Sequence, residues 1–164
     1  MALQLYIFGI TFAFGFSVAG LIINNAIKNK PFYANLSNLN FVKSDRTNRY
    51  LGVLLFRKII VNSFWKYLNQ SLKVSDRPDN RKLIALRNEM TYAEVSHLIA
   101  FICVLIAAVI FEANRLYKGA FIPILVSNVI FHLYPPLLQQ YNKRRIDRII
   151  DRFAVRTAKS SAKL

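Results

Sequence analysis

Hydrophobic and polar positions separate into long blocks along the chain. Leu5–Ile23 contains 19 residues without a charged side chain. A helix rises about 1.5 Å per residue, so about 20 residues cross the apolar core of a bilayer. This block predicts a first transmembrane helix over 5–23, and two further apolar blocks predict transmembrane helices over 94–111 and 120–138. The polar link between the last two is short, which predicts an antiparallel hairpin.

Residues 49–72 alternate between polar and apolar positions with a helical period, in contrast to the uninterrupted apolar blocks. Polar side chains recur at Lys58, Asn62, Lys66 and Asn69, and apolar ones at Phe56, Ile60, Phe64 and Leu68. Two such faces at a spacing of about 3.6 residues are typical of an amphipathic helix. We predict that 49–72 forms a helix in the membrane interface. The same pattern also fits a helix packed against protein.

Individual residues indicate the helix boundaries. Thr91 and Glu94 have the spacing of a capping box, which predicts that the second transmembrane helix begins there. Pro135 and Pro136 are predicted to bend or end the third. The predicted fold class is an all-α integral membrane protein with three transmembrane helices, the interfacial helix and a basic cytoplasmic tail over 139–164. We expect one domain covering 1–164.

Composition and charge agree with a membrane protein. The 164 residues are 54% hydrophobic, yet the formal net charge is +15. Of the 23 Lys and Arg, 13 lie in 25–93, two in 112–118 and eight beyond residue 140. Cytoplasmic flanks are enriched in these residues, so the N-terminus is predicted outside and the C-terminus in the cytoplasm. Nucleic-acid binding is disfavoured because the charge follows the apolar blocks, and a signal peptide because no basic residue precedes the first block.

Familiar metal and catalytic motifs are missing from the sequence. Cys103 is the single cysteine, so neither a disulfide framework nor a paired-cysteine metal site is predicted. There is no H-E-x-x-H, P-loop or G-x-S-x-G motif. We therefore predict no metal and no bound cofactor.

Polar side chains within apolar spans are costly and often functional. Glu94 and His97 are three residues apart in the second span, and Asn128 and His132 are four apart in the third, so each pair shares a helix face. A carboxylate beside an imidazole can orient it as a general base. The alternatives are that the histidines make structural hydrogen bonds and that Glu94 caps its helix.

The hairpin is expected to bring these two spans into register. A turn near 115–117 places His97 level with Pro135, and Glu94 level with Gln139. The polar cluster that follows the third span, Gln139 to Asn142, would then face the Glu94 and His97 pair. The arginines after this cluster are also explained as topology signals that touch anionic lipid.

The first span has a face of small residues on which another membrane helix could pack. Gly15 and Ala19 are four residues apart, with Gly20 adjacent. Small residues at this spacing allow close approach of another helix. We therefore predict a membrane-helix partner at Gly15 and Ala19.

Two segments of the chain resemble a known family. The segments are "YAEVSHLIAFICVLI" and "ILVSNVIFHLYPPLLQQYNKRRI". They are similar to the small membrane acyltransferases named for glycosyl-4,4'-diaponeurosporenoate acyltransferase, which act in carotenoid biosynthesis. The family's A-E-x-x-H pattern and its polar C-terminal ending match Ala93, Glu94, His97, Asn128, Pro135, Gln139, Tyr141, Asn142 and Arg145. Gln140 and Lys143 depart from it, because that ending has arginines there.

The resemblance implies transfer of a fatty acyl group to a hydroxyl of a lipid-like, amphiphilic acceptor, in the parent case the sugar of a glycosylated carotenoid. In a compatible mechanism, His97, oriented by Glu94, is the predicted general base, with Asn142 or Gln139 as the predicted stabiliser of the oxyanion. The predicted substrate-binding residues are Asn128, His132, Gln139, Tyr141 and Arg145. Acyl-CoA or a similar anionic donor is the expected co-substrate, and membrane lipids are expected partners of the basic surface.

Two other functions fit the same features. A non-catalytic subunit of a membrane complex would use the small-residue face for packing and the arginines as an anchor. A polybasic peripheral lipid binder is less consistent with the sequence, because the apolar spans already hold the chain in the membrane.

Overall fold

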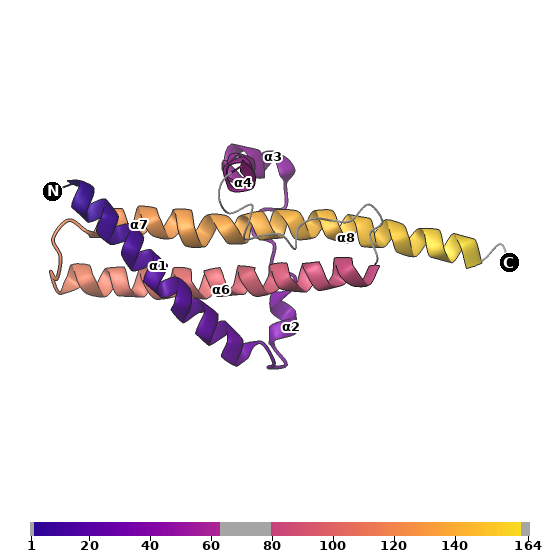
Figure 1. The fold of residues 1–164 in the computed structure, drawn as a ribbon, viewed down its shortest axis with the longest axis horizontal. Helices are drawn as coiled ribbons and strands as arrows, with labels where there is room; N and C mark the ends of the chain where they lie inside the picture. Colours follow the sequence, from indigo (N-terminus) through magenta and orange to yellow (C-terminus); the bar gives the residue numbers. More distant parts are fainter. Residues whose placement is uncertain (1, 63–79, 162–164) are drawn as a thin grey trace. The chain divides into compact units, whose positions relative to one another are not determined.

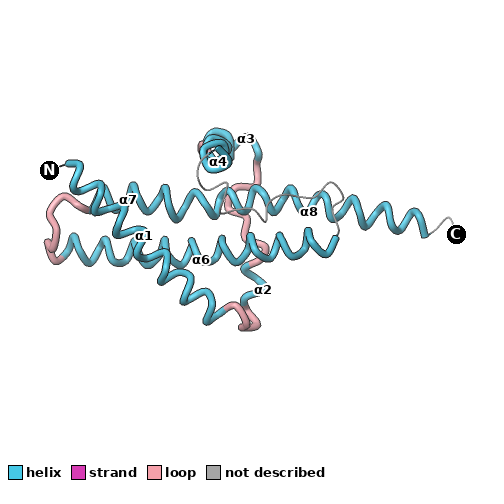
Figure 2. Tube along the Cα trace, in the orientation of Figure 1, coloured by secondary structure: helices cyan, strands magenta, loops and turns pink. Residues whose placement is uncertain are grey.

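The computed structural model describes residues 2–62 and 80–161. Within these two ranges the chain forms helices joined by loops, with no strand (Figure 1, Figure 2). The elements are α1 (Ala2–Ile27), α2 (Tyr33–Leu36), α3 (Asp45–Tyr50), α4 (Val53–Asn62), α6 (Asn80–Ala113), α7 (Phe121–Asn128), the π-helical turn η2 (Val129–Leu133) and α8 (Tyr134–Ser161). The predicted all-helical fold class is confirmed.

Three helical stretches are long and apolar enough to cross a membrane. They are α1, α6 and the continuous run Phe121–Val155 formed by α7, η2 and α8. The three predicted transmembrane helices are therefore confirmed. Each helix extends beyond its apolar block, because the polar residues at the block ends still favour helix once a buried neighbouring turn nucleates it.

One expected helix start is wrong. Thr91 lies inside α6, and its hydroxyl donates to the carbonyl of Arg87 at 3.1 Å, one turn earlier. It therefore caps no helix. Of the two outcomes predicted for Pro135 and Pro136, they do not end the third span, because they occupy the first turn of α8, where the missing N–H groups have no partner within that helix. The π turn η2 directly precedes them.

The described chain divides into two compact units. The first comprises residues 1–39 and 92–137, and the second comprises 40–91 and 138–164. Helices α6 and α8 each contribute residues to both units. The prediction of one membrane domain stays a prediction.

Small residues of α1 form the tight contacts of the first unit. A Cβ added at Gly9 would lie 2.6 Å from the carbonyl oxygen of Pro123 in α7. A Cβ added at Gly20 would collide with the carbonyl oxygen of Ser96 in α6. Together with the buried Ala13, these residues allow α1 to cross α7 and the C-terminal half of α6 at close range (Figure 1).

Aromatic side chains fill the rest of this unit. Val104, Ala108, Ala120 and Ile124 form its apolar core, and Leu5, Phe8, Phe12, Phe16, Phe121 and Leu125 pack against it. Phe12 contacts Phe111 edge to face at a centroid distance of 5.1 Å. Burying these rings against small residues fixes how α1 lies on α7.

The interfacial helix differs from its prediction. Ser44 caps α3 by accepting from the Thr47 N–H at 3.4 Å, and α3 ends at Tyr50. Gly52 then adopts φ 75°, a left-handed conformation that only glycine enters without strain, and α4 begins at Val53. Residues 63–72 of the predicted helix lie outside the described residues.

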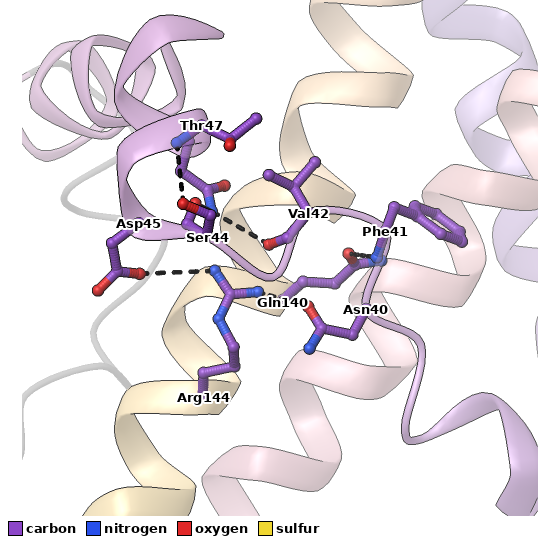
Figure 3. Close-up of polar contacts among 9 residues, drawn as sticks. Asn40, Phe41, Val42, Ser44, Asp45, Thr47, Gln140 and Arg144 are labelled. Carbon is purple, nitrogen blue, oxygen red and sulfur yellow. Dashed lines mark hydrogen bonds and ion pairs between the residues drawn. The ribbon is translucent and has the colours of Figure 1, made fainter.

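In the second unit, Gln140 and Arg144 hold the loop that precedes α3 against α8 (Figure 3). Gln140 accepts from the backbone N–H of Phe41 at 2.8 Å. Arg144 donates to Asn40 at 2.6 Å and lies 3.9 Å from a carboxylate oxygen of Asp45. Arg87 and Asp147 join α6 to α8 in this unit through an ion pair at 2.5 Å.

We predict opposite outcomes for alanine at two glycines of α1. Gly9→Ala should destabilise the protein by about 1–3 kcal/mol, because the new methyl group meets the backbone of Pro123 and Ile124. Gly15→Ala is the matched control, since nothing lies within 4 Å of its added Cβ, and should leave stability unchanged or higher by up to about 1 kcal/mol. The unfolding midpoint in one detergent measures both, and equal midpoints would contradict this packing.

Candidate functional site

Two consecutive prolines shape the third span where it carries its histidine. An α-helix would pair the Phe131 carbonyl with residue 135, and a π-helix would pair it with residue 136, but both positions are proline. The Tyr134 N–H instead donates to Val129, five residues earlier, which closes the π turn η2. The Phe131 carbonyl is thereby left open to a partner from outside its own helix. π turns of this kind occur often at functional sites.

His97 of α6 lies beside this turn. Its ring is close enough to the Phe131 backbone to be affected by it electrostatically, and its Nδ1 lies 3.4 Å from Nδ1 of His132. His132 is completely buried within η2, and its Nε2 lies 2.9 Å from the carbonyl oxygen of Ala13 in α1. The two rings and the Ala13 carbonyl thus form one hydrogen-bonded chain across the first unit.

The order of donors and acceptors along these hydrogen bonds determines which ring nitrogen of each histidine is protonated. A carbonyl oxygen only accepts, so His132 must carry its proton on Nε2. Neutral His132 then offers a lone pair at Nδ1, and His97 must carry its own proton on Nδ1. The remaining lone pair of neutral His97 therefore lies on Nε2. Because His97 is half-buried whereas His132 is fully buried, His97 is the more accessible of the two bases.

Asn128 precedes the π turn and lies one helical turn before His132. Its amide nitrogen donates to the Phe101 carbonyl at 3.1 Å, which joins α7 to α6. Its Oδ1 is buried and has no hydrogen-bond partner among the residues that the structure describes. Asn128 is 1% exposed, so this oxygen is an acceptor held inside the unit.

Glu94 belongs to a second polar cluster in the same unit. The side chain of Asn24, at the end of α1, donates to the Tyr92 carbonyl at 2.9 Å and to the Ser96 hydroxyl at 2.8 Å. Glu94 and Asn24 are both completely buried. Burial raises the pKa of Tyr33 above its usual value; the Asn24 side chain opposes this effect, while Tyr92 and the Glu94 charge add to it. The cluster is therefore close enough for its charges to act on one another.

Four of the predicted site residues lie in the first unit, and four lie in the second. The histidines are in direct contact, whereas Glu94 lies among the residues of the Asn24 cluster. Orientation of His97 by Glu94 stays a prediction, because the described contacts of the ring are with His132 and Phe131. His132, predicted to bind substrate, contacts His97 and the backbone instead.

The remaining predicted residues lie on α8 in the second unit. The Tyr141 ring lies beside two guanidinium groups, 5.8 Å from that of Arg144 and 5.9 Å from that of Arg145. Gln139 and Asn142 are half-buried, and Arg145 is exposed. Their predicted roles in substrate binding stay predictions.

Sequence reasoning missed Asn24, Tyr33 and the role of Ala13. Asn24 had a readable signal, because it directly follows the apolar block and is the first strongly polar side chain after it. Tyr33 had none, since its neighbourhood depends on the turn after α1, where the Tyr33 N–H donates to the Lys30 carbonyl at 3.0 Å. A backbone carbonyl such as that of Ala13 leaves no trace in sequence.

The fold and site define a class of protein: a small all-helical integral membrane protein with a pair of histidines in contact between its spans. Comparison with known families is more specific. The sequence profile described as glycosyl-4,4'-diaponeurosporenoate acyltransferase matches residues 28–152, so the chain belongs to this family. The protein is therefore an acyltransferase of a family of carotenoid biosynthesis. Among curated proteins and among solved structures, nothing matches the chain significantly.

The histidine pair gives a direct test of the π turn. In Pro135→Ala/Pro136→Ala, new N–H groups can bind the carbonyls of η2, so the helix should return to α geometry and rotate His132 away from its partners. The chain has two histidines, so ¹⁵N NMR of the labelled rings resolves both. We expect the intact protein to show one ring protonated at Nδ1 and one at Nε2, and the double variant to lose the Nδ1-protonated ring.

Pro123→Ala is the control for this experiment. Pro123 lies in the first turn of α7, where an N–H has no partner within the helix, so the spectrum should be unchanged. Retention of both tautomers in the double variant would show that the prolines do not set this arrangement.

Proposed function

We propose that the protein transfers a fatty acyl group from acyl-CoA, or a similar thioester, to a hydroxyl of a lipid-like acceptor such as a glycosylated carotenoid. His97 is the proposed general base. The observation that supports this assignment best is the hydrogen-bonded chain from His97 through His132 to the Ala13 carbonyl. It leaves Nε2 of His97 unprotonated, as a base acting on a hydroxyl requires.

The chemical steps follow from this tautomer. The acceptor hydroxyl attacks the thioester carbonyl carbon while its proton passes to Nε2 of His97. The resulting imidazolium keeps its Nδ1–H directed at His132, which limits rotation of the ring. Collapse of the tetrahedral intermediate forms the ester and breaks the C–S bond. His97 then returns its proton to the leaving thiolate, so the base is regenerated.

Polar groups of both units are proposed to bind the reacting groups. Asn128 offers a buried oxygen that can accept from an acceptor hydroxyl. On α8 we propose Asn142 and Gln139 as oxyanion donors, and Tyr141 with Arg145 as contacts for donor phosphates or lipid headgroups. A guanidinium fits these phosphates because it presents paired N–H donors in one plane.

The charge distribution supports an orientation with the N-terminus outside and the C-terminus in the cytoplasm. The link between α6 and α7 carries two Lys or Arg, whereas 13 lie in 25–93 and eight beyond residue 140. This asymmetry follows the positive-inside rule. The basic surface would then face the compartment that supplies acyl-CoA and attract that anionic donor.

His97→Gln should lower acyl transfer by at least about a hundredfold, the lower range for loss of a general base. The readout is mass spectrometry of lipids from cells with matched amounts of each protein, searched for a lipid that gains an acyl-sized mass. Glu112→Gln is the control, because Glu112 is exposed at the other end of α6. Undiminished transfer by a folded His97→Gln protein would refute the assignment of the base.

Cysteine labelling tests the orientation. In a Cys103→Ser background, Lys118→Cys should react with a membrane-impermeant maleimide in intact cells, because the α6–α7 link is expected outside. Arg152→Cys should react only after the cells are permeabilised. The reverse pattern would invert the proposed topology without affecting the assignment of His97.

A further inference from the structure

Two buried polar atoms of the first unit have no partner in the described part of the chain and lie in the same cluster. They are Oδ1 of Asn24 and the hydroxyl of Tyr33. Asn24 is completely buried, and an unpaired buried polar group costs about 1–3 kcal/mol. The Asn24 side chain is near enough to act on the pKa of Tyr33, but the two groups are not joined by a hydrogen bond in standard geometry.

The chemistry of these atoms specifies a ligand. Oδ1 of Asn24 needs a donor. The Tyr33 phenol remains protonated at neutral pH, since burial raises its pKa, so it can donate as well as accept. A hydroxyl both donates and accepts at neighbouring positions, and a head group with several hydroxyls can bind both atoms together.

The position of the cluster favours a lipid head group. The apolar block of α1 ends at Ile23, directly before Asn24, and the apolar block of α6 begins after Glu94. The hydrogen bonds from Asn24 to Tyr92 and Ser96 show that these two block ends lie together. Polar groups at the ends of apolar spans lie at the depth of lipid head groups.

We infer that Asn24 and Tyr33, beside Glu94, form a subsite for the hydroxyl-rich head group of the lipid acceptor. Glu94 and His97 are three residues apart in α6, so about 4.5 Å of helix rise separates Glu94, beside the subsite, from the base. A sugar bound at Asn24 and Tyr33 would therefore present a further hydroxyl toward His97. The inference rests on the proposed acyl transfer, and it assigns the recognition of the acceptor to α1 and α2.

Tyr33→Phe tests the subsite because it removes the hydroxyl and keeps the ring. The full chain is placed in phosphatidylcholine nanodiscs, and its unfolding midpoint is measured with added glucosyl-diacylglycerol or with diacylglycerol of the same chains. For the intact protein we expect a higher midpoint with the glucosyl lipid only. Without added lipid, Tyr33→Phe should unfold at the same or a higher temperature, because it lacks an unpaired buried hydroxyl, and its glucosyl-lipid shift should be smaller.

Tyr6→Phe is the matched control, since Tyr6 lies in the same unit with 46% of its surface exposed, and it should keep the full shift. A lower midpoint of Tyr33→Phe without lipid, together with an unchanged shift, would show that the hydroxyl serves the fold, for example through an internal water. Absence of a glucosyl-lipid shift in the intact protein would equally overturn the subsite.

Acyl transfer to the same two lipids separates this inference from the function on which it rests. Tyr33→Phe should raise KM for the glucosyl lipid by roughly tenfold, the effect of one hydrogen bond, and leave transfer to diacylglycerol unchanged. His97→Gln should lose transfer to both. Transfer by His97→Gln would overturn the proposed function, whereas an unchanged KM in Tyr33→Phe would overturn the subsite alone.

Discussion

An open backbone carbonyl within a membrane span is the constraint on which the candidate site depends. In an apolar environment, no water replaces a lost backbone hydrogen bond. Pro135 and Pro136 remove both backbone donors that could reach the Phe131 carbonyl within its own helix. His97 lies close enough to this backbone to be affected by it. The same interruption accompanies the π turn that carries His132, whose ring contacts His97 and the Ala13 carbonyl.

The second requirement is close approach of α1. Ala13 is completely buried, and its carbonyl accepts from His132 while the small residues Gly9 and Gly20 bring α1 near α7 and α6. A carbonyl oxygen has two lone pairs, so it can accept this bond in addition to the one within its own helix. The packing of α1 therefore also positions the Ala13 carbonyl that binds His132. Substitutions that move α1 should change both the helix contacts and the hydrogen bond of His132.

Sequence patterns predicted the spans well because block length and charge placement are properties of consecutive residues. They also selected Glu94, His97, Asn128 and His132, since polar residues in apolar blocks are conspicuous. They placed the start of α6 wrongly, because the capping-box spacing at Thr91 occurs equally inside a helix, where the hydroxyl bonds back to the preceding turn. The small-residue pattern was also read at Gly15 and Ala19, with Gly20 adjacent, whereas the close contacts within the chain are made by Gly20 and by Gly9, which lies outside that pattern. Spacing alone cannot tell which of several small faces meets a neighbour.

The face with Gly15 and Ala19 has a different environment. It lines an open groove of about 390 Å³ on α1 together with Phe8, Thr11, Phe12 and Phe16. A groove of mostly apolar lining on a membrane helix suits a lipid chain or a second helix equally, so the predicted helix partner stays a prediction.

The opposite face of α1 carries Ala13 and Asn24, which bind His132 and the polar cluster around Tyr92 and Ser96. Because Ala13 and Asn24 lie on one continuous helix, helix geometry sets the separation along α1 between the histidine pair and the polar cluster.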